Sequence, residues 1–198
     1  MKILKKPLLL ARELIKMSVT PGDTVVDATA GNGNDTLFLA ELVGDRGKVY
    51  AFDIQQEAII RTRERLLQAQ MLSRVQLICS GHEHMGGIIN ENVTAVMFNL
   101  GYLPGRDHSF VTKPDTTLAA LQASLNIVKS GGVITLVLYS GHPGGEVEKE
   151  LIIDHCRRLQ QDDFAVSLFE MINWSNHPPA LLAIEKKIPM IELHNSRS

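Results

Sequence analysis

The chain has 198 residues, of which 44% are hydrophobic, and a net charge of −2. That length suits one well-buried domain and is short for two, and the charge excludes a polycation that coats nucleic acid. The only two cysteines, Cys79 and Cys156, lack the spacing of a zinc site, so we predict neither a disulfide framework nor a bound metal. No apolar run approaches the roughly 20 residues of a membrane span, so we expect a soluble, cytoplasmic protein with no membrane partner.

The first elements predicted along the chain are a helix, a strand and a second helix. Residues 3–17 carry Leu10, Leu14 and Met17 at helical spacing, which indicates a leading amphipathic helix. Residues 24–36, TVVDATAGNGNDT, then predict a short β-branched strand, a glycine loop and a helix that extends to about residue 43. Glycines at this spacing provide positive-φ positions and a backbone that a nucleotide-like cofactor can approach closely.

The residues around this loop favour a methyl donor over a dinucleotide. Counted from Gly31 through Gly33, the third glycine of the G-x-G-x-x-G pattern is replaced by Thr36. Asp27, at the end of the strand, would repel a pyrophosphate, whereas its carboxylate suits the cationic α-amino group of S-adenosylmethionine. The next predicted strand ends in Asp53, which can accept both ribose hydroxyls. We therefore expect S-adenosylmethionine as the cofactor, with an NAD-binding domain as the alternative.

The helix predicted over residues 55–71 carries Arg61, Arg63 and Arg65 on its polar side. Such a run is typical of a solvated helix face, and contact with nucleic acid is the alternative interpretation.

A histidine pair follows the third predicted strand, in the segment Gly81-His82-Glu83-His84. Residues two apart on a helix point in different directions, and no third ligand is evident, so the pattern does not favour a metal site. We expect the loop that carries His82 to contact the adenine ring instead.

The order of the remaining elements predicts an α/β fold. Strands are expected over residues 48–53, 75–80, 95–100, 133–139, 164–172 and 180–187, and helices over 83–91, from Pro114 to about Lys129 and from the second glycine loop to about Leu159. Five β-α units followed by two consecutive strands indicate a mostly parallel sheet that ends in an antiparallel hairpin. This arrangement resembles the Rossmann-like class I methyltransferase fold, which implies seven strands in the order 3-2-1-4-5-7-6 and helices on both faces. We expect one domain over residues 1–187 and a loose tail over 188–198.

The end of the fourth predicted strand carries the clearest candidate for chemistry. Asn99-Leu100-Gly101-Tyr102 resembles the [DNS]-P-P-[YFW] motif of methyltransferases that act on amino nitrogen, although Leu100 and Gly101 replace both prolines. The Asn99 carbonyl can accept hydrogens from an amine and aim its lone pair at the methyl group, while Tyr102 can stack on a base. An asparagine that only caps a turn is the alternative.

The amine must be neutral when it attacks, so a nearby group has to accept its proton. Asp107, His108 and His142 follow the fourth or fifth strand and are the candidates, and the sequence does not choose among them.

Long motifs throughout the chain resemble one bacterial family. The matching segments are VDATAGNGNDTLFLA, YAFDIQ, FNLGYLPG, TKPDTT, YSGHPGG and NHPPALLAIEK. The family is the one labelled putative rRNA methylase, whose characterised MnmM/YtqB members methylate tRNA. The resemblance implies methylation of the 5-aminomethyl group of a wobble uridine, usually 2-thiolated, within a tRNA anticodon arm. Ser140 departs from the residues that relatives carry there.

The resemblance also implies roles for individual residues. The methyl donor would be held by Asp27, Gly31, Asn32, Gly33, Asn34, Asp35, Asp53, Gln55, His82 and Asn99. The base would face Asn99, Tyr102, Asp107, Tyr139 and His142. Lys5, Lys6, Arg106 and Lys113 are candidates for phosphate contacts. A methyltransferase for ribosomal RNA or for small amines, a non-catalytic S-adenosylmethionine-binding RNA module and a homodimer all remain open.

Overall fold

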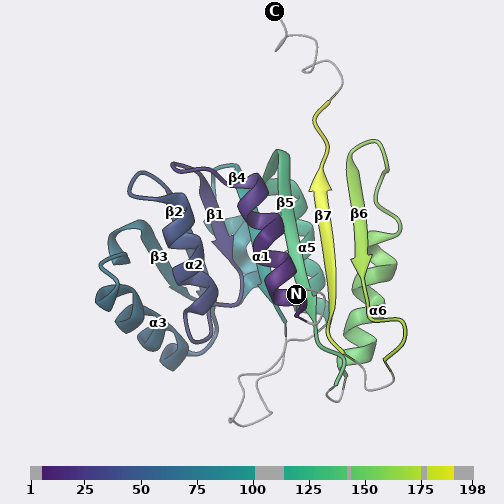
Figure 1. Ribbon diagram of the computed structural model, residues 1–198, viewed down its shortest axis with the longest axis horizontal. Helices are drawn as coiled ribbons and strands as arrows, with labels where there is room; N and C mark the ends of the chain where they lie inside the picture. Colours follow the sequence, from purple (N-terminus) through teal and green to yellow (C-terminus); the bar gives the residue numbers. More distant parts are fainter. Residues whose placement is uncertain (1–5, 101–113, 142–143, 175–177, 190–198) are drawn as a thin grey trace, which may run out of the picture.

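A seven-stranded sheet forms the centre of the molecule (Figure 1). The computed structural model describes residues 6–100, 114–141, 144–174 and 178–189. The strands are β1 (Thr24–Asp27), β2 (Lys48–Asp53), β3 (Val75–Cys79), β4 (Val93–Asn99), β5 (Val128–Leu138), β6 (Phe164–Phe169) and β7 (Ala180–Lys186). Their order is β3-β2-β1-β4-β5-β7-β6, and β7 runs antiparallel to both of its neighbours while the pairs among the first five strands are parallel. The implied strand order and hairpin are thus confirmed.

Helices cover both faces of this sheet, as Figure 1 shows. One face carries α1 (Pro7–Ser18), α2 (Asn34–Val43) and α3 (Gln56–Gln68), and the other carries α4 (Met85–Ile88), α5 (Pro114–Ile127) and α6 (Gly145–Cys156). Short 3-10 turns span Leu72–Arg74 and His82–His84. Among the described residues, no helix is both long and apolar enough to cross a membrane.

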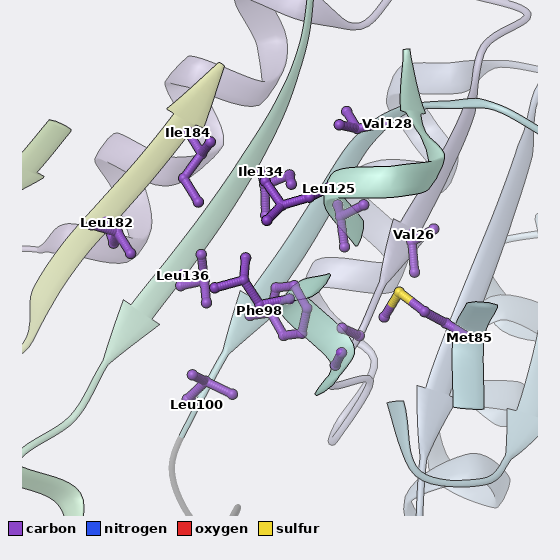
Figure 2. Packing of buried hydrophobic residues seen from close by; sticks show 14 of the residues in the cluster. Val26, Met85, Phe98, Leu100, Leu125, Val128, Ile134, Leu136, Leu182 and Ile184 are labelled. Carbon is purple, nitrogen blue, oxygen red and sulfur yellow. The ribbon is translucent and has the colours of Figure 1, made fainter. Parts of the chain in front are cut away.

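The central strand β4 separates two hydrophobic clusters. Ala95 and Met97 pack with α1 and α2, whereas Val96 and Phe98 pack with α4 and α5. Figure 2 shows the second cluster, in which Phe98 lies among side chains from neighbouring strands. A parallel strand buried on both faces reads as a continuous apolar run, which explains why the segment AVMF was recognisable in the sequence.

Two predicted elements differ most from the structure. The helix expected over 83–91 is a 3-10 turn followed by the four-residue α4, because Gly86 and Gly87 disfavour a longer helix. The fifth strand begins at Val128 rather than at residue 133, since Val128 already pairs with Val93. Gly131, at φ +76°, lets the strand bend through the Gly-Gly pair.

Candidate active site at the carboxyl edge

The glycine loop between β1 and α2 is tightly packed. Gly31 and Gly33 have φ values of +53° and +76°, and Gly33 is the N-cap residue of α2. A Cβ atom on Gly33 would lie 3.0 Å from the Cα of Thr62 in α3. Only glycine combines this conformation with such a close approach, so Gly33 is buried against α3, while Gly31 is partly exposed.

Asp53 joins the end of β2 to the glycine loop. Its Oδ2 accepts a 2.9 Å hydrogen bond from the backbone N–H of Gly31, and its Oδ1 accepts a 2.8 Å bond from the backbone N–H of Gln55. The side chain is half-buried, and a carboxylate oxygen can accept more than one hydrogen bond. Asp53 therefore fixes the loop and keeps acceptor capacity for hydroxyl groups.

Asp27 is fully buried beneath the loop, rather than lining its surface. Its Oδ2 accepts a 2.6 Å hydrogen bond from the hydroxyl of Thr36, and its Oδ1 accepts a 3.0 Å bond from the backbone N–H of Thr29. Burial, followed by the nearby charge of Asp35, raises the pKa of Asp27 from 3.8 to about 7. Because Asp27 is buried, it would act on a bound cation through the electric field of its charge and not through direct contact.

These carboxylates provide a test of whether a cationic ligand fits the site. Asp35 and Asp53 both raise the pKa of Asp27, so the charge of each repels the charge of an ionised Asp27. Their repulsion would be relieved by a positive group bound at the loop. The donor set therefore fits a ligand that carries both a cation and ribose hydroxyls.

Asn99, at the end of β4, is held by hydrogen bonds from two sides. Its backbone N–H donates a 2.8 Å bond to Oγ1 of Thr29, and its side-chain Nδ2 donates a 3.3 Å bond to Oδ2 of Asp35. Because a carboxylate only accepts, the amide nitrogen faces Asp35 and the amide oxygen is turned away from it.

Arg12 of α1 holds Asp35 from its opposite side. Its Nε and Nη2 donate 2.9 Å and 2.6 Å hydrogen bonds to Oδ1 of Asp35, and the guanidinium carbon lies 5.1 Å from the ring centre of Phe38. The Asp35 side chain is 7% exposed, against 25% for Arg12. The amide of Asn99 is thus connected to the N-terminal helix through one buried carboxylate.

Tyr139 lies close enough to this carboxylate to sense its charge. Burial, followed by the charge of Asp35, raises the pKa of the Tyr139 hydroxyl. The tyrosine follows β5, and Asn99 ends the adjacent β4, so the structure brings Asn99, Asp35 and Tyr139 to one corner of the sheet edge.

His82 packs beneath the segment that joins β1 to the glycine loop. Its Nδ1 lies 3.1 Å from the backbone oxygen of Ala28, and its ring packs edge-on against Phe98 at 5.7 Å. Since a carbonyl oxygen only accepts, Nδ1 carries the proton and donates to Ala28. Burial lowers the pKa of His82, so the ring is neutral, and with 8% of the residue exposed little of it faces solvent.

The other predicted site residues divide into two groups. Asn32 and Asn34 are exposed on the loop, and Gln55 is half-buried at the N-cap of α3. Outside the described residues lie Tyr102, Asp107, His142, His108, Arg106, Lys113 and Lys5, while Lys6 is described and exposed. Within the described ranges no group of three His, Cys, Asp or Glu residues could hold a metal ion.

Sequence reasoning missed Arg12 and Thr29. Arg12 reads as part of the polar face of α1, and its partner is 23 positions away. Thr29 stands inside the DATAG segment between two recognised residues, where a small polar side chain gives no separate signal.

One curated protein is similar to this chain in sequence. The chain is 44% identical over 179 residues to a protein of Arabidopsis thaliana named tRNA (mnm5s2U34)-methyltransferase, chloroplastic. This match covers 85% of the chain and 65% of the relative, so the chain spans less than two thirds of the curated relative's length.

Two crystal structures superpose closely on this chain. A "putative rRNA-methylase" from Clostridium thermocellum has a TM-score of 0.90 at 48% identity, with 92% of this chain and 98% of that one covered. A "putative methyltransferase" from Streptococcus mutans, in complex with SAH, has a TM-score of 0.84 at 39% identity and the same coverage. The fold is that of class I methyltransferases. A family model described as "Putative rRNA methylase" matches residues 49–185, and the chain belongs to that family.

Proposed function

We propose that this protein is an S-adenosylmethionine-dependent N-methyltransferase acting on tRNA. The reaction converts 5-aminomethyl(-2-thio)uridine at the wobble position into 5-methylaminomethyl(-2-thio)uridine. The orientation of Asn99 carries the proposal, since Asp35 holds its amide nitrogen and leaves the amide oxygen for an amine hydrogen. The name of the Arabidopsis thaliana relative supports the same substrate. The cytoplasm is the proposed compartment.

The residues around the glycine loop would hold the methyl donor. S-adenosylmethionine supplies a methyl group already activated on a sulfonium. Asp53 accepts hydrogen bonds from the ribose, and the charges of Asp27 and Asp35 favour the cationic end of the donor. Gly31 is partly exposed and has no side chain, which allows the donor to approach its backbone closely. Asn32, Asn34, Gln55 and His82 border this region and complete the proposed donor site.

The chain's contribution to the reaction is alignment. Asn99 accepts a hydrogen from the attacking amine, which directs the nitrogen lone pair toward the methyl group. With its raised pKa, Tyr139 stays protonated at neutral pH, so it packs against or donates to the base rather than taking the proton. Tyr102, Asp107 and His142 complete the proposed base site, and Asp107 and His142 are the proposed proton acceptors.

Methylation of ribosomal RNA is the second candidate. The description of the family favours it. The same donor site and the same Asn99 would serve an exocyclic amine of a ribosomal base, so only the substrate separates the two candidates.

Nucleoside mass spectrometry tests the proposal. The protein is incubated with S-adenosylmethionine and tRNA that carries 5-aminomethyluridine, and a gain of one methyl group on that nucleoside is expected. Transcribed tRNA without the aminomethyl group is the matched substrate control. Methylation of ribosomal RNA alone, with confirmed donor binding, would replace the tRNA assignment by the second candidate.

A further inference from the structure

A polar pocket lies between α2 and α3, next to the glycine loop. The pocket is lined by Asn32, Asn34, Leu37, Arg61, Glu64, Arg65, Gln68 and Ala69. The described residues that organise the carboxyl edge, namely Asp27, Asp35, Asp53 and Asn99, do not line it. The pocket therefore adjoins the proposed donor site, with which it shares Asn32 and Asn34, and does not include these four residues.

Arg61 presents unused hydrogen-bond donors there. Its Nε and Nη2 are buried, and neither has a hydrogen-bond partner among the described residues. A buried guanidinium nitrogen without an acceptor is unfavourable, and an anion bound in the pocket would supply the missing acceptor.

The three arginines of α3 do not all lie on the same side of the helix. Arg61 and Arg65 are four residues apart and share the face that lines the pocket, whereas Arg63 does not line it; Arg61 is half-buried, and Arg63 and Arg65 are both exposed. Glu64 is the single acidic residue among the described residues of the lining, and Asn32 and Asn34 add neutral amide donors. Two guanidinium groups against one carboxylate favour an anionic ligand.

We propose that this pocket binds a phosphate group of the RNA backbone. Guanidinium groups match phosphate oxygens with paired hydrogen bonds, and amides add further donors. The inference rests on the proposed function, which makes RNA the polyanion that reaches this face of the molecule. With a net charge of −2 for the whole chain, phosphate contacts have to be local, as they are here.

The pocket also lies close to the proposed amine site. Asn34 lines the pocket, and the next residue, Asp35, holds the amide of Asn99. The two ligand groups would thus both lie beside the first turn of α2, one at Asn34 and the other near Asp35. A phosphate contact here would position the RNA relative to the reacting base.

Equilibrium binding of full-length tRNA at several salt concentrations tests this proposal. Arg61→Ala and Arg65→Ala should each weaken binding about tenfold. Each should also reduce the slope of log affinity against log salt concentration by about 0.7 to 0.9. Arg63→Ala is the matched control, from the same helix and of the same charge, and should leave affinity and slope unchanged. S-adenosylmethionine affinity should be unchanged in all three variants.

Three results would overturn the assignment. Arg61→Ala and Arg65→Ala behaving like Arg63→Ala in tRNA binding would show that no phosphate is held there. Loss of S-adenosylmethionine affinity with normal tRNA binding would assign the pocket to the donor. A wild-type protein that binds the donor but no tRNA would remove the proposed function and this inference together. If Arg61→Ala does not fold, Arg65→Ala and Arg61→Lys carry the same comparison.

Discussion

The amide nitrogen of Asn99 lies 3.3 Å from Oδ2 of Asp35, although the two residues are 64 positions apart in the chain. Asp35 stands in the first turn of α2, directly after the glycine loop, and Asn99 ends β4. The hydrogen bond therefore couples the proposed donor loop to the proposed amine site. Its polarity determines which atom of the Asn99 amide is left for substrate.

Asn99→Ala should slow methyl transfer by about 100-fold, because the attacking amine loses the group that aligns it. S-adenosylmethionine affinity should change only a few-fold, since the charges of Asp27, Asp35 and Asp53 remain. Single-turnover rates on modified tRNA and calorimetric titration of the donor separate the two effects. Normal turnover by the variant would contradict the proposed role of the amide.

Arg12→Ala should destabilise the fold by about 1–3 kcal/mol, because it leaves the buried carboxylate of Asp35 without its charged partner. Arg12→Lys keeps the charge but loses the paired contacts, so its stability should fall between that of wild type and that of Arg12→Ala. Urea unfolding measures the differences. Methyl transfer should slow as well, since Asp35 would no longer be held against Asn99.

Lys16→Ala is the control for that helix. Lys16 pairs with Glu13 on the exposed side of α1, and both side chains are about half exposed. Its removal should change stability by less than about 1 kcal/mol. Equal losses in Arg12→Ala and Lys16→Ala would show that the contact with Asp35 contributes nothing specific.

Gly33→Ala should be markedly more damaging than Gly22→Ala. Both glycines have positive φ, at +76° and +101°, so each alanine carries backbone strain of about 1–2 kcal/mol. Only at Gly33 does the new Cβ also meet the Cα of Thr62, at 3.0 Å, whereas Gly22 has nothing within 4 Å. Thermal unfolding of the two variants measures the added effect of packing. Equal losses of stability would show that backbone strain alone accounts for the damage at Gly33.

The fold was predictable because its strands are recognisable from short stretches of sequence. The apolar runs that become β1, β2 and β4 end in Asp27, Asp53 and Asn99, so strand ends and candidate site residues were found together. The β5 start was not predictable in the same way. Val128 precedes a Gly-Gly pair that reads as a helix stop, and only its pairing with Val93 makes it part of a strand.

The placement of the candidate site residues was predictable where it follows from position along a strand, and unpredictable where it depends on packing. Asp53 contacts the glycine loop as its place at the end of β2 suggests. Arg12 could not be found, since only the docking of α1 beside α2 brings it to Asp35. The sequence predicted that the Asp27 carboxylate meets the cationic end of the donor, and it gave no sign that Asp27 is fully buried and bonded to the hydroxyl of Thr36.

The raised pKa of Asp27 predicts a pH-dependent stability that Asp27→Asn should remove. The folded protein holds the proton up to a pKa of about 7, whereas the unfolded chain releases it near 3.8. Between these values the folded state binds more protons, so the free energy of unfolding falls as the pH rises. Above pH 7 the full free-energy penalty of an ionised, buried Asp27 is present. The penalty corresponds to roughly 4 kcal/mol. The substituted amide would keep both contacts, accepting from the N–H of Thr29 and donating to Thr36, without a charge.

Urea unfolding of wild type and Asp27→Asn at pH 5 and pH 8 measures this effect. The variant should gain stability relative to wild type at the higher pH, by up to a few kcal/mol. Burial lowers the pKa of His82, which by itself makes stability rise with pH near 6.5, but this contribution is common to both proteins and cancels in the difference. The affinity for S-adenosylmethionine should depend on pH in the direction opposite to stability. In wild type it should increase through pH 7 as Asp27 ionises, and in the variant it should be weaker at pH 8 and flat across this range. An unchanged stability difference at the two pH values would show that Asp27 does not titrate between them, and would contradict the raised pKa.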